Sequence, residues 1–239
     1  AAEEVAHGAL PQALARLAVP ARIEIAPVYP TALADVFGGA KLAPNPIVFC
    51  TAGFVVTDGT TTGIATAGHC SNTMTYYAPG VTTALSLVAG TEYWDADQDV
   101  QVHTSVENEV AAFYWDTAKT SLEYVQGYRS RAQTTVGDYV CHRGEGTGFS
   151  CGFVQSTSYA PNPPGGCNGQ TCDPVYVRLE PGGLDLKCKP GDSGGPAFNE
   201  SVAYGLLVGG APNPATGQCY SVYYTSLDFL PPGWSLAYY

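Results

Sequence analysis

Two short segments of the chain contain residues that could act together in nucleophilic catalysis. One is 66–70 (TAGHC), which contains His69, and the other is 191–196 (GDSGGP), which contains Ser193. A serine hydroxyl is a weak nucleophile until a neighbouring base, most often a histidine, accepts its proton. Glycines around Ser193 favour a tight turn, in which the backbone N–H groups of Gly191 and Ser193 could converge on a developing oxyanion. The two segments together predict acyl transfer.

The order of these residues along the chain limits the folds that could bring them together. The serine segment also matches the GxSxG elbow of α/β-hydrolases, but there the histidine follows the serine. No histidine follows His142, so that fold is excluded. A subtilisin-like order needs an acid before the histidine, and Asp35 or Asp58 could serve. The sequence lacks the helices of that α/β fold.

The segments that must position these side chains have the composition and spacing typical of β-strands. The chain of 239 residues contains 28 Gly and 18 Pro, and short runs such as 53–56 (GFVV) and 175–179 (VYVRL) lie between turn residues. Strands at such short spacing favour an all-β barrel or sandwich. Residues 1–35 differ, because leucines at near-helical spacing predict a short helix around 10–18. The stretch 159–174, rich in Pro and Gly, predicts a surface loop.

Charge and cysteine content restrict the partners and the compartment. A net charge of −11 argues against a nucleic-acid partner. The sequence contains no run of 18 apolar residues, which argues against a segment that spans a membrane. Eight cysteines indicate disulfides and therefore an oxidising compartment. The absence of a CxxC pair argues against zinc. The chain starts without Met, which fits removal of a signal peptide. We expect a secreted monomer that requires no metal and no cofactor.

The histidine and serine segments resemble the signatures of trypsin-like (chymotrypsin-fold) serine proteases. The stretch 141–152 (CHRGEGTGFSCG) is similar to the secreted bacterial branch, the α-lytic protease and streptogrisin group. The resemblance covers about 36–230. It implies an all-β fold of two antiparallel Greek-key barrels with the active site between them. Residues 36–118 would form the first barrel and 119–239 the second, and 1–35 would be an N-terminal extension or the remnant of a pro-segment.

The resemblance also implies the third member of the catalytic group. In the family, an acid between the histidine and the serine precedes alternating apolar residues, and Asp99 followed by Val100 and Val102 fits that pattern. Asp95 and Asp97 are competitors that lack it. His69, Asp99 and Ser193 would then form a catalytic triad, with Gly191 and Ser193 as the oxyanion hole.

The family pattern, together with proximity in the sequence, also suggests how the cysteines pair. It implies four intramolecular disulfides and no free thiol. The pairs would be Cys50 with Cys70, Cys141 with Cys151, Cys167 with Cys172, and Cys188 with Cys219.

The sequence indicates the substrate side chain that the site prefers less clearly than it indicates the triad. By resemblance, the specificity pocket would be built from Leu186, Lys187, Val208, Gly209, Gly210, Tyr220 and Val222. No aspartate stands at its base, which argues against a preference for Arg or Lys. An apolar wall would favour Phe, Tyr or Leu, whereas Lys187 pointing inward would favour an acidic side chain. The family usually has a serine at the position of Val208, where its hydroxyl binds the catalytic aspartate, and Val208 cannot replace it.

Two questions about activation follow from the same resemblance. Asp192 could be bound by a new N-terminus at Val36, as in animal members, or by an internal arginine, as in the bacterial branch. Arg143 is the candidate that we favour, although the common alignment puts His142 there.

An active endopeptidase acting on proteins or peptides is the expected function. A silent binding homologue, a latent zymogen or an esterase are the alternatives.

Overall fold

Short strands joined by turns make up nearly all of the regular structure. The computed structural model describes residues 33–45, 47, 49–162 and 167–239. The predicted helix around 10–18 and residues 163–166 of the predicted loop lie outside them. The described residues contain one helix, the 3₁₀ helix η1 (Leu227–Phe229). No helix of this part of the chain is long and apolar enough to cross a membrane.

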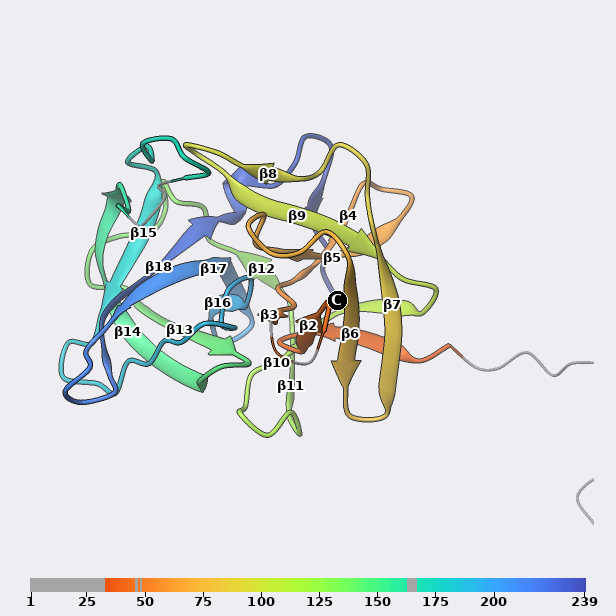
Figure 1. Ribbon diagram of the computed structural model, residues 1–239, viewed down its shortest axis with the longest axis horizontal. Helices are drawn as coiled ribbons and strands as arrows, with labels where there is room; N and C mark the ends of the chain where they lie inside the picture. The colour runs from red at the N-terminus through yellow and green to blue at the C-terminus, as the bar shows by residue number, and fades with distance from the viewer. Residues whose placement is uncertain (1–32, 46, 48, 163–166) are drawn as a thin grey trace, which may run out of the picture. The chain divides into compact units, whose positions relative to one another are not determined.

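The C-terminal strands close into a six-stranded barrel. Its order is β17–β16–β13–β14–β15–β18, and β18 pairs with β17 to complete the ring. Figure 1 shows these strands gathered on the left of the view. A further short strand, β12, joins the barrel in parallel to β17. The bounds are β12 Gly127–Tyr128, β13 Tyr139–Gly144, β14 Gly148–Tyr159, β15 Tyr176–Glu180, β16 Pro196–Asn199, β17 Val202–Pro212 and β18 Cys219–Ser226.

The N-terminal strands form a second, half-closed barrel. Its main sheet has the order β19–β4–β5–β9–β7–β6–β2–β3, with β8 paired to β9, and β1, β10 and β11 form a small separate sheet. The prediction of an all-β fold with two barrels is therefore confirmed. The bounds are β1 Asp35–Gly38, β2 Lys41–Ala43, β3 Cys50–Thr51, β4 Val55–Thr57, β5 Thr62–Thr66, β6 Met74–Ala78, β7 Val81–Leu87, β8 Tyr93–Trp94, β9 Asp99–Thr104, β10 Asn108–Tyr114, β11 Leu122–Tyr124 and β19 Ser235–Leu236.

A buried apolar cluster joins strands of the two barrels. Phe54, just before β4, and Val102 of β9 lie in one cluster with Phe198 and Leu206 from the C-terminal strands. Each side chain of this size contributes about 1.5–3 kcal/mol when it is buried. The cluster therefore fixes the segments that carry His69 and Asp99 against those that carry Ser193.

Two short strands from the C-terminal part of the chain pair with N-terminal strands. The strand β11 pairs with β10, and β19, near the end of the chain, pairs with β4. The division between 36–118 and 119–239 stays a prediction. These pairings show that the polypeptide crosses between the two sheets more than once after residue 118.

All four predicted disulfides are present, and the protein has no free cysteine. The Cys50–Cys70 bond joins β3 to the turn that contains His69. The Cys188–Cys219 bond joins the loop before Ser193 to the start of β18. The other two bonds are local, one between β13 and β14 and one within 167–172. Two of the four bonds therefore brace loops that carry candidate catalytic side chains.

Candidate active site

His69 lies between Ser193 and Asp99 and is within hydrogen-bond distance of both. Its Nε2 atom is 2.8 Å from Oγ of Ser193, and its Nδ1 atom is 2.7 Å from Oδ2 of Asp99. The backbone N–H of His69 also donates to Oδ1 of Asp99 at 2.9 Å. This is the arrangement of nucleophile, base and orienting carboxylate that activates a serine hydroxyl.

Local structure explains how three distant residues meet. Asp99 is the first residue of β9 and is only 1% exposed, while Val100 and Val102 of the same strand lie in the apolar cluster between the barrels. His69 follows β5 in a tight turn. A Cβ atom on Gly68 would collide with the carbonyl oxygen of Tyr93, so only glycine allows this approach. The sequence TAGHC therefore serves a close contact between the turn and β8.

The pKa of His69 depends on two opposing effects. Burial disfavours the imidazolium, but the charge of the Asp99 carboxylate and its hydrogen bond to the ring outweigh burial. The pKa of His69 is therefore raised above its ordinary value. A base of this kind is strengthened for proton transfer from Ser193, and the imidazolium formed in that transfer is stabilised by Asp99.

The turn around Ser193 leaves two backbone donors free. The N–H groups of Gly191 and Ser193 donate to no other group in the described part of the chain, whereas those of Asp192 and Gly194 are bonded. Gly191 has a φ of 102°, in the region that favours glycine. A Cβ atom there would also collide with the ring of Phe49. The turn can therefore present two N–H groups to an oxyanion.

The partner of Asp192 differs from our prediction. Its carboxylate accepts hydrogen bonds from the hydroxyl and the backbone N–H of Thr147 at 2.7 and 2.9 Å, and from the backbone N–H of Lys189 at 2.8 Å. Arg143 instead binds Glu145 through Nη1 at 2.6 Å and also donates to the carbonyl oxygen of Gly39. The prediction that Arg143 binds Asp192 is therefore wrong.

Two neighbouring strand positions explain that difference. Adjacent residues of a strand point to opposite faces, so Arg143 and His142 of β13 cannot face the same group. The electrostatic influence of Asp192 reaches buried His142, although burial dominates and the pKa of His142 is lowered. The alternative partner, an N-terminus at Val36, is also not found at Asp192. Val36 is fully buried in β1, which pairs in parallel with β10.

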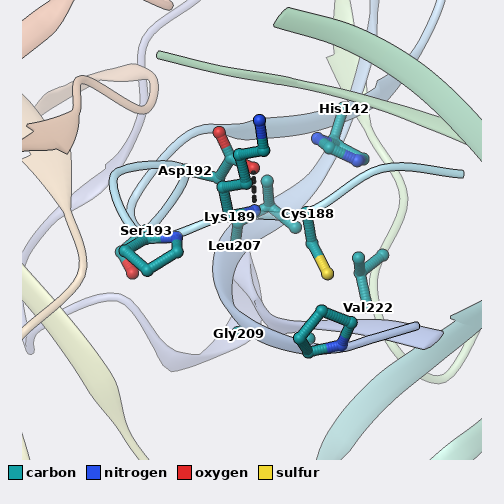
Figure 2. Close-up of a pocket in the computed structure, with 11 residues that line it drawn as sticks. His142, Cys188, Lys189, Asp192, Ser193, Leu207, Gly209 and Val222 are labelled. Atoms are coloured by element: carbon teal, nitrogen blue, oxygen red, sulfur yellow. Dashed lines mark hydrogen bonds between the residues drawn. The ribbon is translucent and has the colours of Figure 1, made fainter. Parts of the chain in front are cut away.

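A cavity of about 340 Å³ opens beside Ser193. Figure 2 shows Ser193 on the left of this cavity and His142 and Val222 on the right. The dashed line in Figure 2 marks the bond from Lys189 to Asp192. Most of the remaining lining is apolar or glycine. It consists of Cys188, Pro190, Leu207, Gly209, Gly210 and Pro212.

The structure places the predicted pocket residues in different environments. Gly209, Gly210 and Val222 line the cavity. The other four do not line it, and the assignment of all seven as substrate-binding residues stays a prediction. Leu186 is fully buried in the core behind the cavity, and Tyr220 is 61% exposed. The ammonium group of Lys187 binds Asp185 at 2.9 Å, and Val208 packs with the tyrosines of a separate apolar cluster.

Several lining residues were missed by the sequence analysis. Leu207 is next to the predicted Val208, and the alternation of strand β17 turns Leu207, not Val208, toward the cavity. His142 was considered only as a partner of Asp192. Its Nδ1 atom is buried without a hydrogen-bond partner, while Nε2 lies 2.8 Å from Oγ of Ser150. Among the described residues, no cluster of three potential ligands could hold a metal ion.

Comparison with known proteins agrees with this geometry. Residues 41–231 match the model of the Trypsin family. The chain is 32% identical over 196 residues to streptogrisin-C of Streptomyces griseus, a match that covers 79% of this chain but only 38% of that protein. It is 30% identical over 174 residues to serine protease 2 of Streptomyces fradiae, covering 70% of this chain and 90% of that protein.

Solved structures are similar at the level of the fold. Thermobifida fusca protease A superposes with a TM-score of 0.66 at 24% identity, covering 86% of this chain and all of that one. Cellulomonas bogoriensis chymotrypsin gives a TM-score of 0.64 at 23% identity with the same coverage. The family match spans both barrels and includes His69, Asp99 and Ser193. The chain therefore belongs to the trypsin family of serine proteases.

Proposed function

We propose that the chain is an extracellular serine endopeptidase with His69, Asp99 and Ser193 as its catalytic residues. The observation that carries the proposal is the continuous hydrogen-bonded row from Ser193 through His69 to Asp99. Oγ of Ser193 attacks the carbonyl carbon of the substrate while Nε2 of His69 takes its proton. The same imidazolium then gives the proton to the leaving amine, and water repeats the sequence on the acyl-enzyme.

The two free N–H groups provide the electrostatic part of the proposal. During attack, the carbonyl oxygen becomes an oxyanion, and the N–H groups of Gly191 and Ser193 are available to bind it. Donors fixed in advance stabilise the developing charge without reorganisation, and removing one such donor typically slows turnover about 10²- to 10³-fold.

An extended peptide is the substrate that best fits the surface beside the cavity. Up to Leu206, strand β17 pairs with β16, but from Gly209 onward its partner among the described strands is β18 alone. One edge of β17 is therefore open next to Ser193, and an extended peptide could pair with it as an added strand. This argument favours peptide substrates over small esters.

An apolar side chain is the preferred occupant of the cavity. Leu207, Val222 and Pro212 give it an apolar wall, and the carboxylate of Asp192 is already held by Thr147 and Lys189. The acidic alternative relied on Lys187, whose charge is paired with Asp185 outside the cavity. Lys189 and His142 also line the cavity, so cleavage after acidic residues is the outcome that would overturn this preference.

Four disulfides support an oxidising location, as in secreted proteins.

A silent homologue on the same fold would be expected to lack a member of the catalytic group, whereas here all three members are in hydrogen-bonded positions. A latent form that awaits removal of an N-terminal segment remains the second candidate. The completed geometry around Asp192 and Ser193 supports the active form.

The test is labelling by a peptidyl organophosphonate, which reacts with activated serines, followed by intact-mass measurement. We expect a single label on the natural chain and none on Ser193→Ala. A folded sample with four intact disulfides that takes no label would reject the proposed activity. A peptide library then assigns the side-chain preference, for which we expect cleavage after Phe, Tyr or Leu.

A further inference from the structure

Thr51, at the end of β3, lies where the segments of the active site meet. It is fully buried. Its hydroxyl donates to the carbonyl oxygen of Gly191 at 2.7 Å, and its backbone N–H donates to the carbonyl oxygen of Ser193 at 2.8 Å. One residue of the N-terminal barrel thus holds both residues whose N–H groups form the candidate oxyanion hole.

Thr51 is itself held from two further directions. Its hydroxyl oxygen accepts a hydrogen bond from the backbone N–H of Glu145 at 2.9 Å. Its carbonyl oxygen accepts from the hydroxyl of Thr66, three residues before His69, at 2.9 Å. A backbone N–H can only donate, so the hydroxyl proton of Thr51 is free to serve the carbonyl oxygen of Gly191. The direction of the contact with Gly191 is therefore fixed.

The turn at Gly191 needs such a constraint. Glycine has access to many backbone conformations, and an N–H stabilises an oxyanion only when it points at the developing charge. Gly191 has a φ of 102°, and rotation about its backbone bonds would turn its N–H away. That carbonyl oxygen belongs to the Gly191–Asp192 peptide group, so its hydrogen bond to Thr51 fixes one of the two peptide groups that meet at Gly191 and opposes rotation about the backbone bonds between them.

Glu145 gives the contact a rigid support. Its carboxylate binds Arg143 at 2.6 Å and Lys119 at 2.7 Å, and both the arginine and the carboxylate are largely shielded from water. Its N–H is thereby held toward Thr51. Close packing also holds Thr51 against the residue after Ser193. A Cβ atom on Gly194 would collide with the hydroxyl of Thr66 and the carbonyl oxygen of Thr51.

We propose that Thr51 is a positioning residue of the oxyanion hole, acting through the carbonyl oxygens of Gly191 and Ser193. The inference rests on the proposed endopeptidase activity. Thr51 does not touch the reacting atoms. Its hydroxyl keeps the N–H of Gly191 aimed at the oxyanion, so its loss affects the transition state more than the bound substrate.

Thr51→Val tests the role of the hydroxyl with little change of shape. We expect kcat to fall roughly 10- to 100-fold with KM almost unchanged, the range expected when catalytic groups are slightly misplaced. Affinity for a peptide boronic acid, whose tetrahedral adduct places an oxygen in the oxyanion hole, should fall by a similar factor. Thr51→Ser keeps the hydroxyl and should restore both quantities.

Thr91→Val is the matched control. The hydroxyl of Thr91 is also buried, donates to the carbonyl oxygen of Val88 at 2.8 Å and accepts from the N–H of Val102 at 3.2 Å. This control loses the same kind of bonds without contact with the serine turn. It should lower thermal stability but not the affinity for the boronic acid.

Three outcomes separate the possibilities. If the natural chain takes no phosphonate label, the proposed function fails and the inference fails with it. If the natural chain is active and folded Thr51→Val binds the boronic acid as tightly as before, only the role of Thr51 is overturned. If Thr51→Val does not fold, Thr51→Ala, which also lacks the hydroxyl, is measured instead, and the same losses are expected.

Discussion

Both oxygens of the Asp99 carboxylate are bonded to the same residue, His69. Oδ1 accepts the backbone N–H of His69 at 2.9 Å, and Oδ2 lies 2.7 Å from Nδ1 of its ring. No other residue in the described part of the chain donates to Asp99, and Val208 stands where its family usually supplies a serine hydroxyl. On its Nδ1 side, the ring therefore depends on this one two-point contact for its orientation.

Asp99→Asn should lower kcat about 10⁴-fold, the loss expected when the histidine is held in the wrong tautomer. The backbone N–H of His69 would retain the amide oxygen, so the amide NH₂ would face Nδ1. Nδ1 must then accept, which places the ring proton on Nε2 and prevents His69 from acting as base. Steady-state hydrolysis of a peptide substrate measures the effect.

The competitors Asp95 and Asp97 provide the controls for that substitution. Oδ1 of Asp95 accepts backbone N–H groups within its own turn, including that of Gln98 at 3.0 Å. Neither carboxylate contacts His69. Asp95 and Asp97 are half-buried, and Asp95→Asn and Asp97→Asn should keep kcat within about tenfold of the natural chain, since polar substitutions away from the reacting groups act weakly. A loss at Asp97 equal to that at Asp99 would contradict the assignment of the triad.

The pH dependence of activity should follow His69. The base must be neutral to accept the proton of Ser193, and Asp99 raises the pKa of His69 above 6.5. Activity is therefore lost as pH falls through a value above 6.5 and is retained at higher pH. The acid limb of kcat/KM against pH reports this pKa for the free enzyme. A midpoint below 6.5 would show that burial, not Asp99, controls the ring.

Side-chain preference should be insensitive to Lys187. Its ion pair with Asp185 is partly exposed and is worth at most about 1 kcal/mol, so Lys187→Ala should change kcat/KM by less than about tenfold for any substrate.

Val222→Ala, by contrast, shortens a side chain of the cavity wall and so enlarges the cavity. It should favour Phe and Tyr over Leu by about 10-fold, the usual range for changes of one or two methyl groups. A peptide series with matched flanking residues compares the two variants.

The residues that we propose as the triad could be selected from the sequence because each carries a local signal. His69 and Ser193 lie in distinctive segments, and Asp99 precedes an alternating strand. The four disulfides could be assigned by resemblance, since the cysteines occur near those same segments. Such signals survive in a single sequence because the chemistry requires particular residue types at fixed positions.

Contacts between distant segments carried no comparable signal. Arg143 and His142 are adjacent, and which of them faces Asp192 depends on the face that β13 turns toward the serine loop. Thr51 lies 140 residues before Gly191, and nothing in its neighbourhood marks its hydroxyl as a link. The direction of the Lys187 side chain is set by its ion pair with Asp185, which the sequence does not reveal. In each case the outcome depends on register and packing rather than on the residue alone.

His103 should make the fold sensitive to acid. It is fully buried on β9, opposite Ile64 and Leu87 of the neighbouring strands. Neither ring nitrogen has a hydrogen-bond partner in the described part of the chain. Burial therefore disfavours the charged form and lowers the pKa of His103 to about 4 from an ordinary value of 6.5.

The consequence for stability follows from proton binding in the two states. Between pH 6.5 and 4, the unfolded chain binds a proton at His103 that the folded chain does not, so the free energy of unfolding decreases as the pH falls. The loss is about 3 kcal/mol in total. Above pH 6.5 both states are neutral at this position, and His103 contributes no pH dependence.

His103→Leu should remove this part of the acid sensitivity, because leucine fills a similar space without a titrating group. Urea unfolding from pH 7 to pH 4, in a Ser193→Ala background that prevents self-digestion, measures the free energy at each pH. We expect the free energies of unfolding of the two proteins to diverge as the pH falls below 6.5, with the His103→Leu variant the more stable. Since the carboxylates and His142 titrate equally in both chains, the difference isolates His103. Parallel curves would mean that His103 is protonated in the folded state or becomes hydrated before the chain unfolds.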